Sequence, residues 1–271
     1  IMSSDWSSDV CSSDLGATAV AFWRVFLGGL ALAILALVRS RSLRLPPGTM
    51  RWCLLAGFAF FVDLLCWHRS ILYVGTGMAT ILGNTQVFAT AILSVFVFQE
   101  RLSYRLLLSA ILAFTGLIFL VGVGSQGVDF TPTYLLGVFL GLATGLSYAG
   151  YIVSLKRGIT QEGEPDLLAF MAWTSLLAAA FLGPAAVLEG APLLPTGWVD
   201  TGALFLYGLL IQAAAWLIIT KALPSVPTAQ AGLILLLQPI LATAWGVAFF
   251  NESLTVLQLL GAALTIAGLY W

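Results

Sequence analysis

The chain has 271 residues, of which 60% are hydrophobic and 8% charged, and its formal net charge is −1 at pH 7. Soluble domains average about 45–50% apolar and about 25% charged residues, so this chain has too few charges to cover a water-soluble body of its size. The composition excludes a secreted disulfide scaffold and a cytosolic enzyme, and the net charge argues against a nucleic-acid-binding protein. We therefore expect an all-α integral membrane protein.

Residues 1–15 differ from the rest of the chain. They repeat the triplet Ser-Ser-Asp three times, without the basic start and apolar core of a signal peptide, and hydrophobic sequence begins abruptly after them. We interpret residues 1–15 as a non-native segment, similar to translated sequencing adapter, that replaces a real first segment. No functional prediction rests on it.

A helix needs about 20 apolar residues to cross the ~30 Å hydrocarbon layer of a bilayer. From Ala17 onward nine apolar stretches have about this length, and they are continuous rather than alternating, which favours helices over strands. The predicted spans are approximately 17–38, 52–73, 75–98, 105–123, 134–156, 167–188, 202–221, 226–250 and 254–271. The connectors are too short to hold a soluble domain, so we expect a bundle of nine helices.

The basic residues predict the orientation of these spans. Connectors on one side of the membrane hold nine Lys and Arg, and those on the other side hold only Arg69. Because basic connectors stay in the cytoplasm, the basic side and the C-terminus should be cytoplasmic. The nine are Arg39, Arg41, Arg44, Arg51, Arg101, Arg105, Lys156, Arg157 and Lys221.

The chain contains an internal repeat. Residues 76–119 align without a gap on 228–271, at an offset of 152, with 13 identities over 44 positions. The identities include two polar pairs, Gln86 with Gln238 and Glu100 with Glu252, which bulk hydrophobicity does not explain. We interpret the two tracts as a duplication.

The predicted orientation makes these repeats inverted. Glu100 falls on the cytoplasmic side and Glu252 on the opposite side, which requires an odd number of helices in each repeat. We assign a first repeat to 16–127, with four helices, and a second to 128–271, with five, so one helix should be missing before Ala17. Ten helices are expected in the native protein. Two halves of opposite topology can open a central site alternately to either face, which is typical of secondary transporters.

Several motifs resemble the EamA-type transporters of the drug/metabolite transporter superfamily. The first repeat carries Asp63-Leu-Leu-Cys-Trp-His68, Gly75-Thr-Gly-Met-Ala-Thr80 and Val97-Phe-Gln-Glu-Arg101, and the second carries Gly232-Leu-Ile-Leu-Leu-Leu-Gln-Pro239 and Phe249-Phe-Asn-Glu252. The resemblance covers residues 17–271. It implies ten helices around a central cavity and, commonly, export of small metabolites such as amino acids.

Two ionisable residues fall inside predicted spans. Arg24 should lie roughly 10 Å from the outer face and Asp63 roughly 13 Å from it, given a rise of 1.5 Å per residue, so their levels nearly match. We expect them to pair, either as a structural ion pair or in substrate binding or coupling. Trp67 shares a helix face with Asp63. His68, the only histidine, could serve a proton-coupled cycle or make interfacial hydrogen bonds.

Other polar residues in the spans are candidates to line a cavity. Gln86 and Gln238 occupy equivalent mid-span positions, Asn84 lies near Gln86, and Pro239 should loosen its helix at Leu235. Interhelical hydrogen bonding alone would also explain the glutamines. Tyr148 and Tyr151 offer an aromatic wall and a hydroxyl group, as cavity residues or as interfacial anchors.

The remaining features indicate structural roles. Gly137, Gly141 and Gly145 recur every four residues, a spacing that lets helices approach closely. Glu100 and Glu252 end their helices near the membrane surface, where each carboxylate can accept bonds from the first amides of the next helix.

The sequence therefore predicts a secondary transporter, not an enzyme, in a bacterial inner membrane. We expect an exporter of amino acids or similar small metabolites, with a small-molecule substrate and the lipid bilayer as its partners. No ATP-binding GxxxxGK[ST] loop is present, so the energy should come from a proton or substrate gradient. No metal or other cofactor is expected, because the three cysteines lack metal-ligand spacing. The alternative is an integral membrane enzyme that acts on a lipid or lipid-linked substrate.

Overall fold

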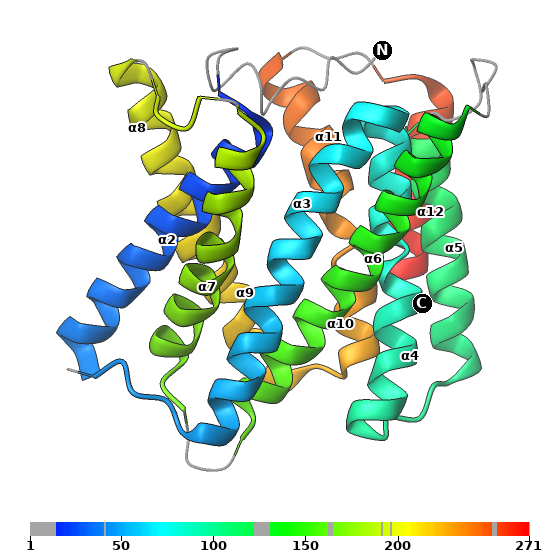
Figure 1. Ribbon diagram of the computed structural model, residues 1–271. Coiled ribbons are helices and arrows are strands. Elements are labelled where there is room, and N and C mark those ends of the chain that lie inside the picture. The colour runs from blue at the N-terminus through cyan, green and yellow to red at the C-terminus, as the bar shows by residue number, and fades with distance from the viewer. Residues whose placement is uncertain are drawn as a thin grey trace. The chain divides into compact units, whose positions relative to one another are not determined.

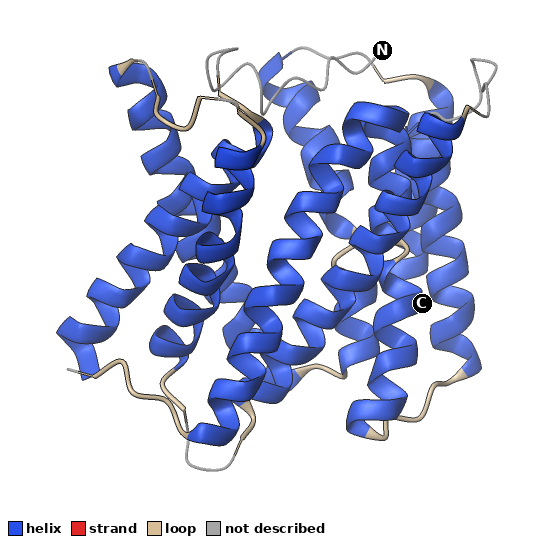
Figure 2. Ribbon diagram, viewed as in Figure 1, coloured by secondary structure: helices blue, strands red, loops and turns tan. Residues whose placement is uncertain are grey.

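The computed structural model describes residues 15–40, 42–121, 131–161, 165–190, 192–195, 197–250 and 254–270, and all regular structure in these ranges is helical (Figures 1 and 2). The predicted non-native segment, apart from Leu15, lies outside them. The α-helices are α2 (Ala17–Ser40), α3 (Pro47–Asn84), α4 (Gln86–Phe98), α5 (Tyr104–Val121), α6 (Pro132–Ile159), α7 (Leu167–Leu188), α8 (Trp198–Tyr207), α9 (Trp216–Ala222), α10 (Thr228–Ile234), α11 (Leu237–Phe250) and α12 (Val256–Tyr270). A π-helix, η1 (Gly208–Ala215), joins α8 to α9, and a short 3₁₀ turn, η2 (Leu223–Ser225), follows α9.

Hydrophobicity locates most of these helices. Seven helical stretches are long and apolar enough to cross a membrane, and the shorter apolar helix α12 adds to them. The predicted span 167–188 coincides with α7. The predicted spans 52–73 and 75–98 fall in one continuous apolar stretch, Pro47–Phe98, in which α3 continues past their boundary to Asn84. The chain is therefore a multi-pass helical membrane protein.

Two long apolar stretches are broken where uniform hydrophobicity gave no sign of an end. Thr85 separates α3 from α4, and Leu235 and Leu236 separate α10 from α11, at nearly equivalent places in the aligned repeats. The second break lies where Pro239 was expected to loosen the helix, because its ring crowds the carbonyl group four residues earlier.

Gly75 interrupts α3 at the boundary between two predicted spans. Its dihedral angles, φ 78° and ψ 161°, are not helical and lie in a region that only glycine adopts without strain. A β-carbon there would meet no atom within 4 Å. The requirement for glycine is therefore conformational rather than steric.

The described residues fall into two compact units. Unit 1 comprises the chain up to Leu65 together with Gly150–Ser225, and unit 2 comprises Cys66–Ala149 together with Val226–Trp271. In unit 1, α2 packs against α7 and against η1. In unit 2, α5 packs against α12, and α4 against α10.

Glycines bring α5 and α12 into backbone contact. A β-carbon at Gly116 would lie 2.5 Å from the Thr265 nitrogen, and one at Gly268 would lie 2.7 Å from the Ala113 nitrogen. The Thr265 hydroxyl donates to the carbonyl oxygen of Ala113 at 3.2 Å. Side chains of Val87, Leu117 and Leu236 complete the buried apolar cluster beside this contact.

We predict that Gly75→Ala lowers the free energy of unfolding by about 1 kcal/mol or more, because alanine is strained at a positive φ. Gly202→Ala is the matched control: Gly202 lies in α8, and a β-carbon there also meets no atom within 4 Å. The control should be neutral or slightly stabilising. Thermal unfolding of both variants in detergent checks this, and equal midpoints would show that Gly75 carries no conformational constraint.

Candidate functional site

Arg24 and Asp63 lie in unit 1, on α2 and α3. The Asp63 side chain is 8% exposed. The Nε atom of Arg24 is buried without a hydrogen-bond partner. A direct ion pair between the two stays a prediction, but the structure places an unused donor and a carboxyl group in the same unit.

Aromatic rings lie beside the Arg24 guanidinium. The Arg24 guanidinium carbon lies 5.8 Å from the centre of the Phe60 ring and 5.4 Å from that of Tyr207. Phe60 stacks on Tyr151, with ring centroids 4.4 Å apart and an interplanar angle of 10°. Tyr151 in turn meets Trp216 edge to face at 5.0 Å. Ring faces attract a cation, so these rings stabilise the guanidinium away from water.

The π-helix η1 adds an amide that sequence analysis missed. Gln212 is fully buried, and its Nε2 donates to Ser175 Oγ at 3.0 Å, while its Oε1 has no hydrogen-bond partner. A β-carbon at Gly28, one turn from Arg24, would lie 2.5 Å from the Gln212 Cβ. A glutamine within an apolar stretch is the pattern that made Gln86 a candidate, and the same pattern could have identified Gln212 from the sequence. π-Helical segments are frequent at functional sites.

The two equivalent glutamines of unit 2 have different surroundings. Gln86 is fully buried; its Nε2 donates to the carbonyl oxygen of Gly232 at 2.9 Å, and its Oε1 accepts from Thr90 at 3.0 Å. Gln238 is exposed, and its Nε2 donates to the Tyr148 hydroxyl at 3.4 Å. Gln86 is therefore buried and hydrogen-bonded between helices, whereas Gln238 is exposed.

The other predicted cavity residues make local contacts. Asn84 Nδ2 donates to the Thr80 carbonyl oxygen at 2.8 Å, one turn earlier in α3. The rings of Trp67 and His68 meet edge to face at 5.1 Å. Pro239 is half-buried beside Gln238.

The glycine row on α6 lies against α3 within unit 2. A β-carbon at Gly137 would lie 2.6 Å from the Tyr73 Cβ, and one at Gly141 would lie 2.6 Å from the Leu82 Cβ. One at Gly145 would collide with the Thr85 hydroxyl. These glycines permit close helix packing, as their spacing indicates.

Glu100 binds the start of a helix far along the chain. One carboxylate oxygen accepts from the Thr228 amide and hydroxyl at 2.8 Å each, and the other accepts from the Ala229 amide at 3.3 Å. Sequence analysis expected partners in the next helix, α5; the structure places them instead at the N-terminus of α10. Glu252 lies outside the described residues.

The predicted site residues thus divide between the units. Unit 1 holds Arg24, Asp63 and Tyr151, and unit 2 holds Trp67, His68, Asn84, Gln86, Tyr148, Gln238 and Pro239. Within the described ranges, no three His, Cys, Asp or Glu side chains form a group that could hold a metal ion.

Apolar helices with charged and amide groups buried between them define a polytopic membrane protein with polar sites inside the membrane. The EamA-like transporter family matches residues 6–122 and 135–271, and the chain belongs to this family. It is therefore classed with membrane transporters rather than enzymes.

Curated relatives agree with this assignment, and a solved structure shares the fold. The chain is 28% identical to a probable amino-acid metabolite efflux pump of Salmonella typhimurium, over 72% of this chain and 66% of that protein. It is 29% identical to the threonine/homoserine exporter RhtA of Escherichia coli, over 93% of this chain and 80% of that protein. One crystal structure shares its fold with a TM-score of 0.81 at 18% identity, over 97% of this chain and 90% of the other.

We predict that Glu100→Gln lowers the free energy of unfolding by about 1–2 kcal/mol, because the α10 N-terminus loses a charged acceptor. Glu189→Gln is the comparison, since Glu189 Oε1 accepts from the Thr18 hydroxyl at 2.9 Å rather than from helix N-terminal amides, and its substitution should cost less. Thermal unfolding in detergent gives both values. An equal or larger loss for Glu189→Gln would contradict the role given to Glu100.

Proposed function

We propose that this protein is a secondary active transporter that exports amino acids or similar small metabolites by alternating access between two inverted repeats. The reciprocal packing of α5 on α12 is the observation that carries the proposal. The names of the two exporter relatives support the direction and the substrate class.

The proposed bundle has nine membrane crossings in the described residues. The stretch Pro47–Phe98 contains 52 residues, about 78 Å of helix, which is more than twice the hydrocarbon thickness. It therefore holds two crossings, divided at Gly75. The other six long apolar stretches and α12 add seven crossings, which gives the nine spans expected from hydrophobicity. They are divided between the proposed repeats 16–127 and 128–271.

The α5–α12 contact supports the inverted relation of the repeats. Under the offset of 152, Ala113 corresponds to Thr265 and Gly116 to Gly268. Gly116 meets Thr265, and Ala113 meets Gly268, so each helix offers equivalent residues to the other. From Ala113 to Gly116 along α5, the contacted residue on α12 moves back from Gly268 to Thr265, so the two helices run antiparallel. Equivalent helices that pack antiparallel through equivalent residues are what a two-fold axis between inverted repeats produces.

The glutamine asymmetry fits one state of an alternating cycle. Gln86 bonds across to Gly232, and the equivalent contact for Gln238 would be with Thr80. Gln238 instead bonds to Tyr148, and the Thr80 carbonyl oxygen accepts from Asn84. In the opposite state the two glutamines would exchange these roles. Gln86 would then be released, and Gln238 would bond across to the first repeat.

Arg24 and Asp63 are the proposed binding groups for the substrate. An α-amino acid carries a carboxylate and an ammonium group; the Arg24 guanidinium, with its unused Nε–H, would bind the carboxylate, and the Asp63 carboxyl group of the same unit would bind the ammonium group. Phe60, Tyr151 and Trp216 would supply the apolar wall. A proton gradient is the proposed energy source, with Asp63 and His68 as the groups that could carry the proton.

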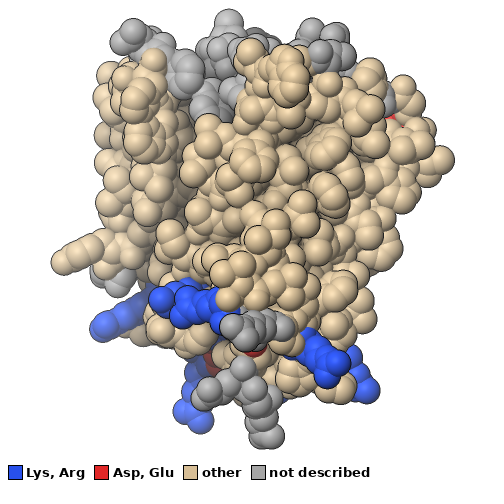
Figure 3. All heavy atoms as spheres, turned by 90° about the vertical axis from the view of Figure 1, so that its left-hand side faces the viewer, with Lys and Arg blue, Asp and Glu red and all other residues tan. Residues whose placement is uncertain are grey.

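The proposed location is a bacterial inner membrane with the C-terminus in the cytoplasm. In unit 1 the basic residues gather at one end, and Figure 3 shows Lys and Arg at one end of the face in view. Basic connectors stay in the cytoplasm. Arg101 and Arg105 place the start of α5 on that side, and α12, antiparallel to α5, would end there.

Counterflow in proteoliposomes tests the transporter proposal without knowledge of the coupling ion. Vesicles loaded with unlabelled threonine, homoserine or another amino acid should transiently accumulate the labelled compound. Asp63→Asn and Arg24→Gln should each reduce the initial rate at least about tenfold, as expected when a buried charged contact to the substrate is lost.

Asp200→Asn is the control, because Asp200 lies in the first turn of α8 and is not part of the proposed site. This variant should keep most of the wild-type rate. Counterflow that Asp63→Asn and Arg24→Gln leave unchanged would refute the binding site. An absence of counterflow by folded protein for every metabolite in a broad panel would refute the transporter proposal.

A further inference from the structure

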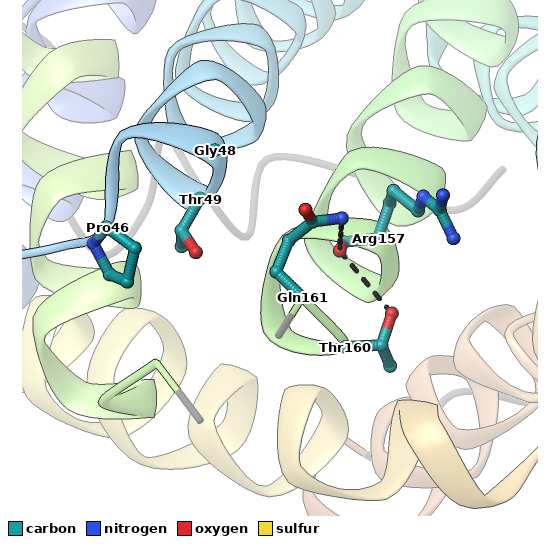
Figure 4. A pocket seen from close by; sticks show the side chains of 6 residues that line it. All are labelled: Pro46, Gly48, Thr49, Arg157, Thr160 and Gln161. Atoms are coloured by element: carbon teal, nitrogen blue, oxygen red, sulfur yellow. Dashed lines mark hydrogen bonds between the residues drawn. The ribbon is translucent and has the colours of Figure 1, made fainter. Parts of the chain in front are cut away.

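A pocket lies in unit 1 between the start of α3 and the end of α6. Its volume is about 290 Å³, and it is lined by Pro46, Gly48, Thr49, Arg157, Thr160 and Gln161 (Figure 4). None of these residues belongs to the proposed substrate site.

Thr49 is the unusual member of the lining. Its side chain is 0% exposed, and its hydroxyl oxygen has no hydrogen-bond partner. Figure 4 shows the Thr49 hydroxyl and the Gln161 amide on facing walls of the pocket. Buried hydroxyl groups are nearly always hydrogen-bonded, so an unpaired one that faces a pocket indicates that a polar group binds there.

The N-terminus of a long helix opens on the same pocket. Pro47 is the first residue of α3, and the Met50 amide makes the first bond back along the chain, to Pro46 at 2.9 Å. The amides of Gly48 and Thr49 therefore precede the first helical hydrogen bond, and the helix dipole adds positive potential there. A β-carbon at Gly48 would lie 3.4 Å from Gln161 Oε1, so the absent side chain leaves this end of the helix open.

Charged residues of both signs lie on the pocket or near it in the sequence: basic residues line and flank it, and Glu162, Glu164 and Asp166 follow Gln161 in the sequence. Arg157 lines it, Lys156 precedes Arg157 in the last turn of α6, and Arg51 follows in the second turn of α3. No acidic residue is among the six that line it. The Arg157 guanidinium points away from Thr49 in Figure 4, so it contributes potential rather than a contact in this arrangement.

The Thr160 hydroxyl donates to the Lys156 carbonyl oxygen at 2.8 Å, with the Arg157 carbonyl oxygen at 3.4 Å, and Gln161 Nε2 donates to the Arg157 carbonyl oxygen at 3.2 Å. The donors that remain for a ligand are the Thr49 hydroxyl and the backbone amides of Gly48 and Thr49. Hydroxyl groups and backbone amides at a helix N-terminus are donors that bind tetrahedral oxyanions.

We propose that this pocket binds a phosphate-class oxyanion through Thr49 and the N-terminal amides of α3. The ligand is the phosphodiester of an anionic lipid headgroup or free inorganic phosphate. A lipid source fits the basic end of unit 1, since basic pockets between transmembrane helices bind anionic headgroups. This site is separate from transport chemistry and does not depend on the proposed export activity.

Thr49→Val tests the site, because valine keeps the shape of threonine and removes the hydroxyl. The full chain is delipidated in detergent, and binding is followed by native mass spectrometry and thermal shift with phosphatidylglycerol, phosphatidylcholine or sodium phosphate. Wild type should bind phosphatidylglycerol or phosphate, and Thr49→Val should weaken that binding about tenfold. Arg157→Gln should weaken it less.

Thr144→Val is the matched control, since Thr144 also has a buried hydroxyl without a partner but lies in unit 2, away from the pocket. This variant should bind as wild type does. Stabilisation by phosphatidylglycerol but not by phosphatidylcholine or phosphate identifies a lipid headgroup, and stabilisation by inorganic phosphate identifies the free ion. Binding of neither ligand, or equal binding by both threonine variants and wild type, would overturn the proposal.

Discussion

Backbone contact between α5 and α12 is the constraint on which unit 2 depends. Lipid gives apolar helices no hydrophobic reason to associate, so close packing and interhelical hydrogen bonds must hold them together. Gly116 and Gly268 remove the side chains that would separate the two backbones, and Thr265 then bonds across to Ala113 at 3.2 Å. The same device recurs where α6 meets α3 at Gly141. Helix association and the proposed pseudo-symmetry thus have one physical origin.

Most other buried polar side chains are explained by the need for hydrogen-bond partners in an apolar solvent. The Gln86 amide nitrogen donates to the Gly232 carbonyl oxygen, and its amide oxygen accepts from the Thr90 hydroxyl. The Glu100 carboxylate accepts three hydrogen bonds from the start of α10. The exceptions are therefore informative. Four side-chain atoms of the described residues are buried without partners: Arg24 Nε, Thr49 Oγ1, Thr144 Oγ1 and Gln212 Oε1. Unpaired groups are costly in a lipid-embedded protein, and a ligand can supply the missing partner.

Hydrophobicity predicted most of the fold, because span length and continuity are properties of the local sequence. The interval 167–188 is α7 itself, and the boundary between 52–73 and 75–98 falls at Gly75. The break at Thr85 was harder to locate, since apolar residues continue through it, whereas Pro239 indicated the break at Leu235. Of the predicted site residues, Arg24, Asp63 and Tyr151 belong to unit 1, and their common role stays a prediction. Contacts between distant segments, such as Glu100 with Thr228, are set by tertiary packing and leave no local pattern.

The most direct test of alternating access compares how two equivalent positions react with a label. Gln86→Cys and Gln238→Cys would be placed singly in a chain whose own cysteines are replaced, and modified in membranes with an impermeant maleimide. The account predicts that position 238 reacts readily in the state seen here and position 86 does not. Conditions that favour the opposite state, set by saturating substrate or a reversed gradient, should exchange the two reactivities. A position 86 that stays protected under every condition, while the protein still transports, would contradict alternating access between these repeats.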